Sequence, residues 1–206
     1  PPMPRLPTAS GLTRALACPT SCVLVQTTSS ESSHASLGRE VHIFLERVAK
    51  GEGVSCAVLG LSSEAKAFAE ALDLERLPVD LLSGGWDAEV PLSYDLDSGE
   101  ARRLDAAAGR AYGSVPASTV VGTADLLRVT GDTVLVVDAK TGRGWLPPPG
   151  QSGQLRFLAL AAATIHGASE AIVGHLSLRP DGSTWLEVET LDALELGLVR
   201  EQLQDA

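Results

Sequence analysis

Two runs of strand-forming residues joined by a short turn constrain the fold of this chain more than any other feature. The runs are residues 119–129 (TVVGTADLLRV) and 133–140 (TVLVVDAK), and Thr130-Gly131-Asp132 between them is typical of a β-hairpin turn. Residues 146–153 (LPPPGQSG) then break the chain, and the alanine-rich apolar residues 154–167 predict a helix. A hairpin followed by such a helix favours a mixed α/β arrangement.

The rest of the chain alternates between helical and strand patterns. Helices are predicted at 35–50, 62–74 and 191–204, a strand–turn–strand unit at 88–105, and a second hairpin at 170–191. This order predicts an α/β fold in which a central mixed β-sheet is flanked by helices. A chain of 206 residues is long enough for one sizeable core, so we expect a single domain over residues 1–206 with residues 1–12 loosely ordered.

Composition excludes several functional classes. An apolar fraction of 44% and a charged fraction of 20% are those of an ordinary soluble globular protein. The formal charge of −10 argues against a protein that coats nucleic acid non-specifically, although a cluster of catalytic carboxylates adds to the negative count until metal binds. The sequence contains no run of about 18 consecutive apolar residues, so no membrane span is predicted. The first residues lack the pattern of a secretion signal.

The three cysteines point to a reducing compartment. Cys18, Cys22 and Cys56 cannot all pair, and a four-thiolate metal or iron–sulfur site needs a fourth cysteine that the sequence lacks. We therefore predict no iron–sulfur cluster and interpret the cysteines as reduced thiols of a cytoplasmic protein.

Charged residues end the central hairpin. Asp125 lies in its first strand and Asp138 near the end of its second, and adjacent antiparallel strands bring such side chains close together. Two neighbouring carboxylates repel unless a cation lies between them or one of them stays protonated, and oxygen ligands suit Mg²⁺ or Mn²⁺. Lys140 follows on the same face, where its ammonium can orient a water or stabilise charge on a phosphate. The same three residues also fit a solvated strand end with an ordinary ion pair.

Further motifs, in order along the chain, resemble the PD-(D/E)XK nuclease superfamily, and within it the RecB-like branch. That branch includes the CRISPR-associated exonucleases and the nuclease domains of bacterial recombination helicases. The G-x-x-D and D-x-K-T-G motifs across one hairpin are fairly specific, and a G-x-x-x-H helix upstream strengthens the resemblance. The matching segments are LTRALACPTSC (12–22), GREVHIFLE (38–46), GTADLL (122–127), VVDAKTG (136–142) and QLRFLALA (154–161).

The resemblance implies a restriction-endonuclease-like core and a role for each matching residue. The implied metal ligands are His42, Asp125, Asp138 and the backbone carbonyl of Ala139, holding Mg²⁺ or Mn²⁺. Lys140 would position or activate the nucleophilic water. Gln154 would orient the lysine or contact the nucleic-acid backbone, although it also fits a simple helix start. The implied reaction is phosphodiester hydrolysis with one or two metal ions.

The chain departs from the family pattern at one position. Leu158 stands where the last motif has a tyrosine. Glu89 matches a glutamate sometimes found near the family's site. His34, His166 and His175 match no motif, and we expect structural roles for them. Arg143, Arg156 and Trp145 are candidate nucleic-acid contacts, the tryptophan by stacking on an unpaired base.

Two functions from different classes fit these observations. The first is a metal-dependent deoxyribonuclease, exonuclease-like and acting on DNA ends, that works in DNA repair, recombination or defence. The second is a nuclease-fold module without robust activity that binds nucleic acid or a protein within a larger complex. The four-residue set of His42, Asp125, Asp138 and Lys140 favours the enzyme. A helicase or another protein of a larger complex is a candidate partner.

Overall fold

The computed structural model describes residues 8–12, 33–82, 84–105, 115–142 and 144–205. Within them, one sheet has the strand order β2-β1-β3-β4-β5-β6, in which β4 and β5 run parallel and all other neighbours are antiparallel. The strands are β1 (Asp87–Asp95), β2 (Ala101–Arg103), β3 (Thr119–Thr130), β4 (Thr133–Lys140), β5 (Glu170–Leu178) and β6 (Thr184–Leu191). The predicted central mixed sheet, with both hairpins at their predicted turns, is confirmed.

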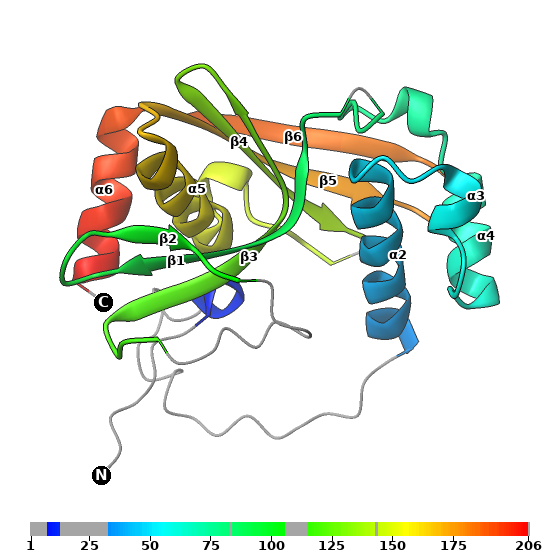
Figure 1. Ribbon diagram of the computed structural model, residues 1–206, viewed down its shortest axis with the longest axis horizontal. Helices are drawn as coiled ribbons and strands as arrows, with labels where there is room; N and C mark the ends of the chain where they lie inside the picture. Colours follow the sequence, from blue (N-terminus) through cyan, green and yellow to red (C-terminus); the bar gives the residue numbers. More distant parts are fainter. Residues whose placement is uncertain (1–7, 13–32, 83, 106–114, 143, 206) are drawn as a thin grey trace, which may run out of the picture.

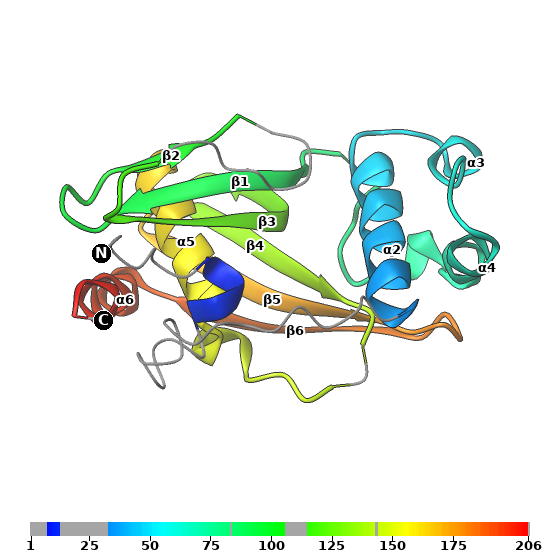
Figure 2. The ribbon, with the colours of Figure 1, turned by 90° about the horizontal axis from the view of Figure 1, so that it is seen from below.

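Helices cover the sheet in two groups. Figures 1 and 2 show α5 and α6 together at one end of the sheet and α2, α3 and α4 at the other. The helices are α2 (Ser33–Ala49), α3 (Val54–Ala57), α4 (Ser63–Ala71), α5 (Gly153–His166) and α6 (Ala193–Gln204), with 3₁₀ turns η2 (Leu74–Arg76) and η4 (Pro149–Gln151). No helix among the described residues is both long and apolar enough to span a membrane.

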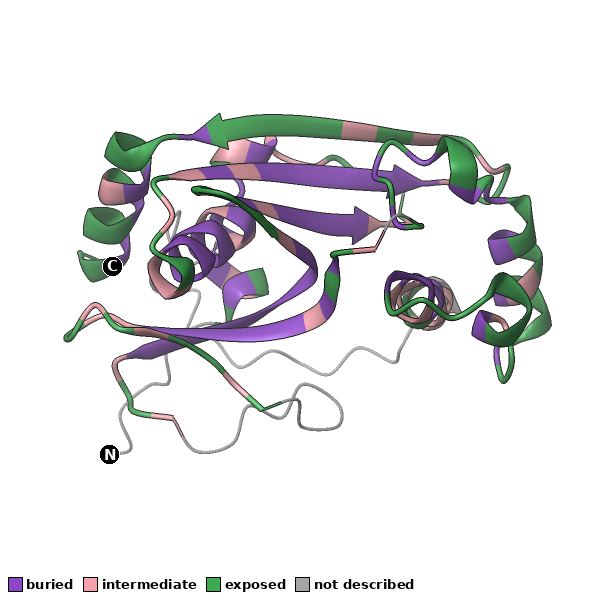
Figure 3. Ribbon diagram, turned by 45° about the horizontal axis from the view of Figure 1, so that its top comes forward, coloured by how far each residue is buried: buried purple, intermediate pink, exposed green. Residues whose placement is uncertain are grey.

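Helix α5 is apolar on nearly every side because the sheet curves around it. Its residues from Leu155 to Ala163 are buried except Arg156, and it packs on β3 and β4 and against α6. Figure 3 shows α5 and the central strands buried, whereas the edge strand β6 is mostly exposed. Alanine predominates because short side chains let a helix approach the strands on several sides.

Strand β4 contributes side chains to two hydrophobic cores, one on each of its faces. Val134 and Val136 of β4 face the core around α5, whereas Val137 and Ala139 face a second core with α2 and α4. A strand that is buried on both faces reads as a continuous apolar run, which is why the sequence there lacks alternation until Asp138. The charged end of β4 therefore lies between two apolar layers.

The start of the described chain is packed, in contrast to the expectation of loose order for residues 1–12. Residues 9–12 are helical, and Ala9 and Leu12 are each 3% exposed. The close contact requires Gly122 of β3, because a Cβ there would lie 2.3 Å from the Ala9 Cβ. Residues 1–7 lie outside the described part of the chain, as do Cys18 and Cys22.

Candidate metal and nuclease centre

Asp125 lies just beyond the last paired residues of the β3–β4 hairpin, at the end away from the turn. The pairing of these strands runs from Thr130–Thr133 to Leu126–Val137, so Ala139 lies beyond its end on the β3 side. The carboxylate of Asp125 accepts a 2.8 Å hydrogen bond from the Ala139 backbone N–H. This bond satisfies a buried donor and at the same time holds Asp125 against β4.

Helix α2 brings His42 to the same backbone segment. Gly38 lets the helix approach the end of β4, because a Cβ at this position would lie 3.1 Å from Thr141 Oγ1. One turn later, His42 Nε2 lies 3.0 Å from the carbonyl oxygen of Ala139. The four-residue spacing of the glycine and the histidine therefore has a geometric reason, since both lie on the helix face that meets β4.

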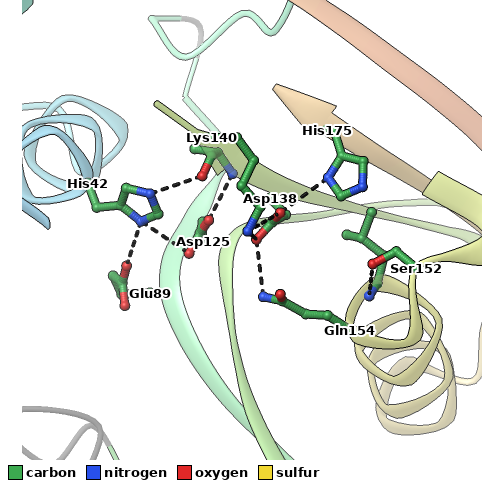
Figure 4. Close-up of polar contacts among 10 residues, drawn as sticks. His42, Glu89, Asp125, Asp138, Lys140, Ser152, Gln154 and His175 are labelled. Atoms are coloured by element: carbon green, nitrogen blue, oxygen red, sulfur yellow. Dashed lines mark hydrogen bonds and ion pairs between the residues drawn. The ribbon is translucent and has the colours of Figure 1, made fainter. Parts of the chain in front are cut away.

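His42, Glu89 and Asp125 form a compact group of potential metal ligands (Figure 4). His42 Nδ1 lies 3.3 Å from Asp125 Oδ1 and 3.7 Å from Glu89 Oε1. The ligand atoms of the three side chains lie within 4.8 Å of one another. Asp125 is 8% exposed, and the histidine and the glutamate are 22% and 25% exposed. One imidazole nitrogen and two carboxylates at this separation fit Mg²⁺ or Mn²⁺.

The charge state of His42 shows how strongly this group attracts a cation. Burial by itself lowers the pKa of His42, but the hydrogen bonds and negative charges of Asp125 and Glu89 outweigh burial and raise that pKa to about 10. The metal-free protein therefore holds a protonated imidazole between the two carboxylates at neutral pH. A metal ion that binds there has to displace this proton.

Glu89 reaches the group through a distorted backbone. Its φ is 50°, and no other non-glycine residue in the described part of the chain has a positive φ. The pairing of β1 with β3 passes directly from Ala88–Leu126 to Val90–Ala124. Ala88 and Leu126 belong to the core under α2, whereas Val90 and Ala124 belong to the core around α5. The strands thus change faces at Glu89 and Asp125, which turns both carboxylates toward His42.

This strain gives a prediction about stability. Replacing Glu89 by glycine should give a protein more stable than the Glu89→Ala variant by about 1 kcal/mol, because a left-handed conformation costs a residue with a Cβ about that much. Both variants lose the carboxylate and should bind Mn²⁺ more weakly than the wild type. Chemical denaturation with EDTA measures the first effect and isothermal titration the second.

The matched control for Glu89 lies two residues earlier, where β1 begins with Asp87. Asp87→Gly should be less stable than Asp87→Ala, since glycine weakens a strand with ordinary backbone angles. Equal or lower stability of Glu89→Gly than of Glu89→Ala would contradict the strain.

Asp138 forms a second group with a lysine, a glutamine and a histidine. Asp138 is 3% exposed. Its two carboxylate oxygens lie 2.9 Å and 2.7 Å from Lys140 Nζ, and they accept hydrogen bonds from Gln154 Nε2 at 3.1 Å and from His175 Nδ1 at 3.2 Å. Burial raises the pKa of Asp138, but the His175 hydrogen bond and the Lys140 charge outweigh burial and hold that pKa below the usual range of an aspartate. Asp138 is therefore an ionised carboxylate, and both of its oxygens accept hydrogen bonds.

Ala139 joins the two groups. Its N–H binds Asp125 and its carbonyl contacts His42, while the neighbouring residues on either side, Asp138 and Lys140, belong to the second group. Figure 4 shows the side chains of both groups converging on this one strand end. Three carboxylates, two histidines and one lysine thus gather around this strand end.

Most of the residues predicted from sequence meet here, and some do not. His42, Asp125, Asp138, Lys140, Gln154 and the Ala139 backbone all lie in the two groups, with Ala139 O against His42. Asp138 is not within the three-ligand group of His42, Glu89 and Asp125. Arg156 interacts with Glu195 of α6, and Trp145 is 85% exposed in the loop after β4. Arg143 lies outside the described residues.

Two outcomes concern residues that the motifs did not specify. Leu158, at the family's tyrosine position, is fully buried in the core around α5. His175 has no motif, yet it is 3% exposed and contacts Asp138, because the parallel β4–β5 register places these two residues opposite each other. A histidine within the apolar run of residues 170–178 was the available signal, but only the strand register gives it a partner.

Comparisons with known proteins show which family the chain resembles. The chain matches the model of the PD-(D/E)XK nuclease superfamily over residues 8–205. No curated protein matches it. Among solved structures, the crystal structure of SSO0001 aligns with 93% of this chain and 82% of that chain, at 17% identity and a TM-score of 0.30. So low a TM-score supports no structural or functional argument.

Proposed function

The chain belongs to the PD-(D/E)XK nuclease superfamily, and from this premise we propose that it is a metal-dependent deoxyribonuclease that hydrolyses phosphodiester bonds. One observation carries the proposal. The same short strand end, Asp138 to Lys140, contacts a potential metal-ligand group on one side and carries a lysine–aspartate pair on the other.

The donor set of the first group supports divalent metal binding. His42, Glu89 and Asp125 would hold Mg²⁺ or Mn²⁺, and Asp138 would complete the ligand set together with the Ala139 carbonyl. Such an ion supplies a Lewis acid for a phosphoryl oxygen and a bound water of lowered pKa. Ala139 O lies 3.0 Å from His42 Nε2, and the second lone pair of this carbonyl oxygen could face the ion while His42 Nδ1 faces the two carboxylates.

The second group supports the handling of water and phosphate. Lys140 is 31% exposed and its ammonium lies against Asp138, so one face of the ammonium remains accessible to a substrate phosphate or an attacking water. Gln154 donates to the same Asp138 oxygen as the lysine, so it positions the aspartate and, through it, the lysine. His175 holds the other Asp138 oxygen from the far side.

The finer assignment rests on the resemblance of the motifs. We propose a RecB-like nuclease that acts on DNA ends, in a cytoplasmic repair, recombination or defence pathway, with a helicase or another protein delivering the substrate. Arg143, Arg156 and Trp145 remain proposed nucleic-acid contacts. Arg156 is the weakest of these because it is partly buried and already interacts electrostatically with Glu195 of α6. The protein is proposed to act as a single domain without an iron–sulfur cluster.

The test is cleavage of end-labelled DNA with Mn²⁺, Mg²⁺ or EDTA, alongside Asp125→Asn. Single-stranded and double-stranded substrates report end and strand preference. We expect products only with metal, and at least about a hundredfold less product from Asp125→Asn, since the variant loses a negatively charged metal ligand while its amide oxygen can still accept from the Ala139 N–H. Asp132→Asn, in the hairpin turn, is the matched control and should cleave normally.

Two outcomes of this test would contradict the proposal. Absence of cleavage by the wild type, with Mn²⁺ binding intact, would favour a module that binds nucleic acid or protein within a larger complex. Absence of Mn²⁺ binding by titration would contradict the metal group itself.

A further inference from the structure

An aromatic side chain and an arginine form an exposed pair beside the proposed centre. Trp185 on β6 is 45% exposed, and the guanidinium carbon of Arg179 lies 4.6 Å from the centroid of its ring. A side chain exposed to this extent is accessible to a ligand. The arginine holds the ring in one orientation by a cation–π contact.

The strand register places this pair in line with the catalytic lysine. Lys140 of β4 pairs with Ser177 of β5, and Ser177 pairs with Trp185 of β6. Paired residues point to the same face of a sheet, and two strand spacings amount to about 10 Å. Trp185 therefore lies on the face of Lys140 and Asp138, at the distance of one or two nucleotides.

A backbone contact ties the pair to the loop that follows the site. Arg179 Nη1 donates to the carbonyl oxygen of Gly142, two residues after Lys140. The arginine thus bridges the end of β4 and the indole on β6. A ligand stacked on Trp185 would contact a group whose position is set by the same loop as the lysine.

The charges on β6 distinguish a base from a phosphate at this place. Glu187 and Glu189 lie on the same face of the strand as Trp185, and both are exposed. Their carboxylates repel a phosphate group, whereas the face of a nucleobase carries no charge and stacks on an indole. Within a duplex that face is already covered by neighbouring bases, so only an unpaired base is available.

From these observations we propose that Trp185, held by Arg179, is a stacking site for an unpaired base next to the scissile phosphodiester. The proposal rests on the proposed nuclease function and deepens it, because it names the substrate as a single strand or a frayed end. The phosphate backbone would then pass on the side of Lys140 and Arg179, away from the two glutamates.

The experiment compares binding of a fluorescein-labelled oligo-dT strand and of a blunt duplex, measured by anisotropy in EDTA. Trp185→Ala should weaken binding of the single strand by about tenfold to a hundredfold, the usual loss for a base–aromatic stack, and Trp185→Phe should retain most of the affinity. Val188→Ala is the control, since Val188 is 50% exposed on the opposite face of β6. Thermal unfolding of each variant checks that the fold is intact.

Two results would overturn the stacking site. One is equal affinity of wild type and Trp185→Ala for oligo-dT, and the other is an equal loss of affinity for the blunt duplex. Cleavage of the same strand with Mn²⁺ is measured in parallel. Trp185-dependent binding without any cleavage by the wild type would contradict the nuclease function but support the stacking site, and cleavage with Trp185-independent binding would do the reverse.

Discussion

Replacing Lys140 by methionine is expected to lower the rate of DNA cleavage by at least about a hundredfold without weakening Mn²⁺ binding. Methionine keeps the length and apolar character of the side chain but removes the ammonium that lies 2.7 Å from Asp138. The loss of one positive charge next to the ligand group should leave metal affinity unchanged or increase it. The expected result is therefore a separation of catalysis from metal binding.

Single-turnover cleavage and Mn²⁺ titration on the same preparation measure the two quantities. Lys50→Met is the matched control, because Lys50 directly follows α2, is exposed and, among the described residues, forms its ion pair with Glu46 one turn away. It should cleave at the wild-type rate. A Lys140→Met variant that cleaves within about threefold of the wild type would remove the lysine from the mechanism, whatever its effect on metal binding.

The second large effect is expected at His175, where leucine and asparagine should behave differently. The ionised Asp138 carboxylate can only accept, so His175 Nδ1 carries the proton that it donates. His175→Leu fills the same space without a donor and should lower Mn²⁺ affinity or activity by about tenfold to a hundredfold, the usual cost of losing a group that orients a metal ligand. His175→Asn places an amide N–H near the position of Nδ1 and should restore most of the activity.

Stability distinguishes positioning from a structural role for His175. Among the described residues, its Nε2 is buried without a hydrogen-bond partner, so leucine removes one unsatisfied atom as well as one useful donor. The melting temperature of His175→Leu should therefore fall little, in contrast to its activity. Equal activity of the leucine and asparagine variants, or losses of activity that follow melting temperature, would contradict the positioning role. His166→Asn, at an exposed position at the end of α5, is the control.

Local patterns were sufficient to predict the elements and much of the candidate site. The two hairpin turns and the apolar α5 follow from residues close together in sequence, and the structure confirms them. The spacing of Gly38 and His42 indicated that both lie on one face of a helix. Asp138 and Lys140 indicated a site at the end of β4, because a buried strand does not tolerate two charges without partners. The superfamily resemblance added the metal-ligand role of His42 and the role of Gln154.

The arrangement of the charges into two groups required the tertiary structure. Whether Asp138 would face Asp125 or His175 depends on strand register, which a one-residue shift reverses and which no local pattern specifies. Glu89 joins His42 only because β1 changes faces at a backbone angle that sequence does not reveal.

The amino-acid sequence by itself thus determined which helices and strands form and which residue types gather at the end of β4, because periodicity and turn chemistry act over a few neighbours. Only the tertiary structure decided which partner each carboxylate takes, which histidines reach them and where Trp185 lies relative to Lys140. Those contacts join residues from 14 to 97 positions apart, and long-range register and helix packing, rather than local preference, set their distances.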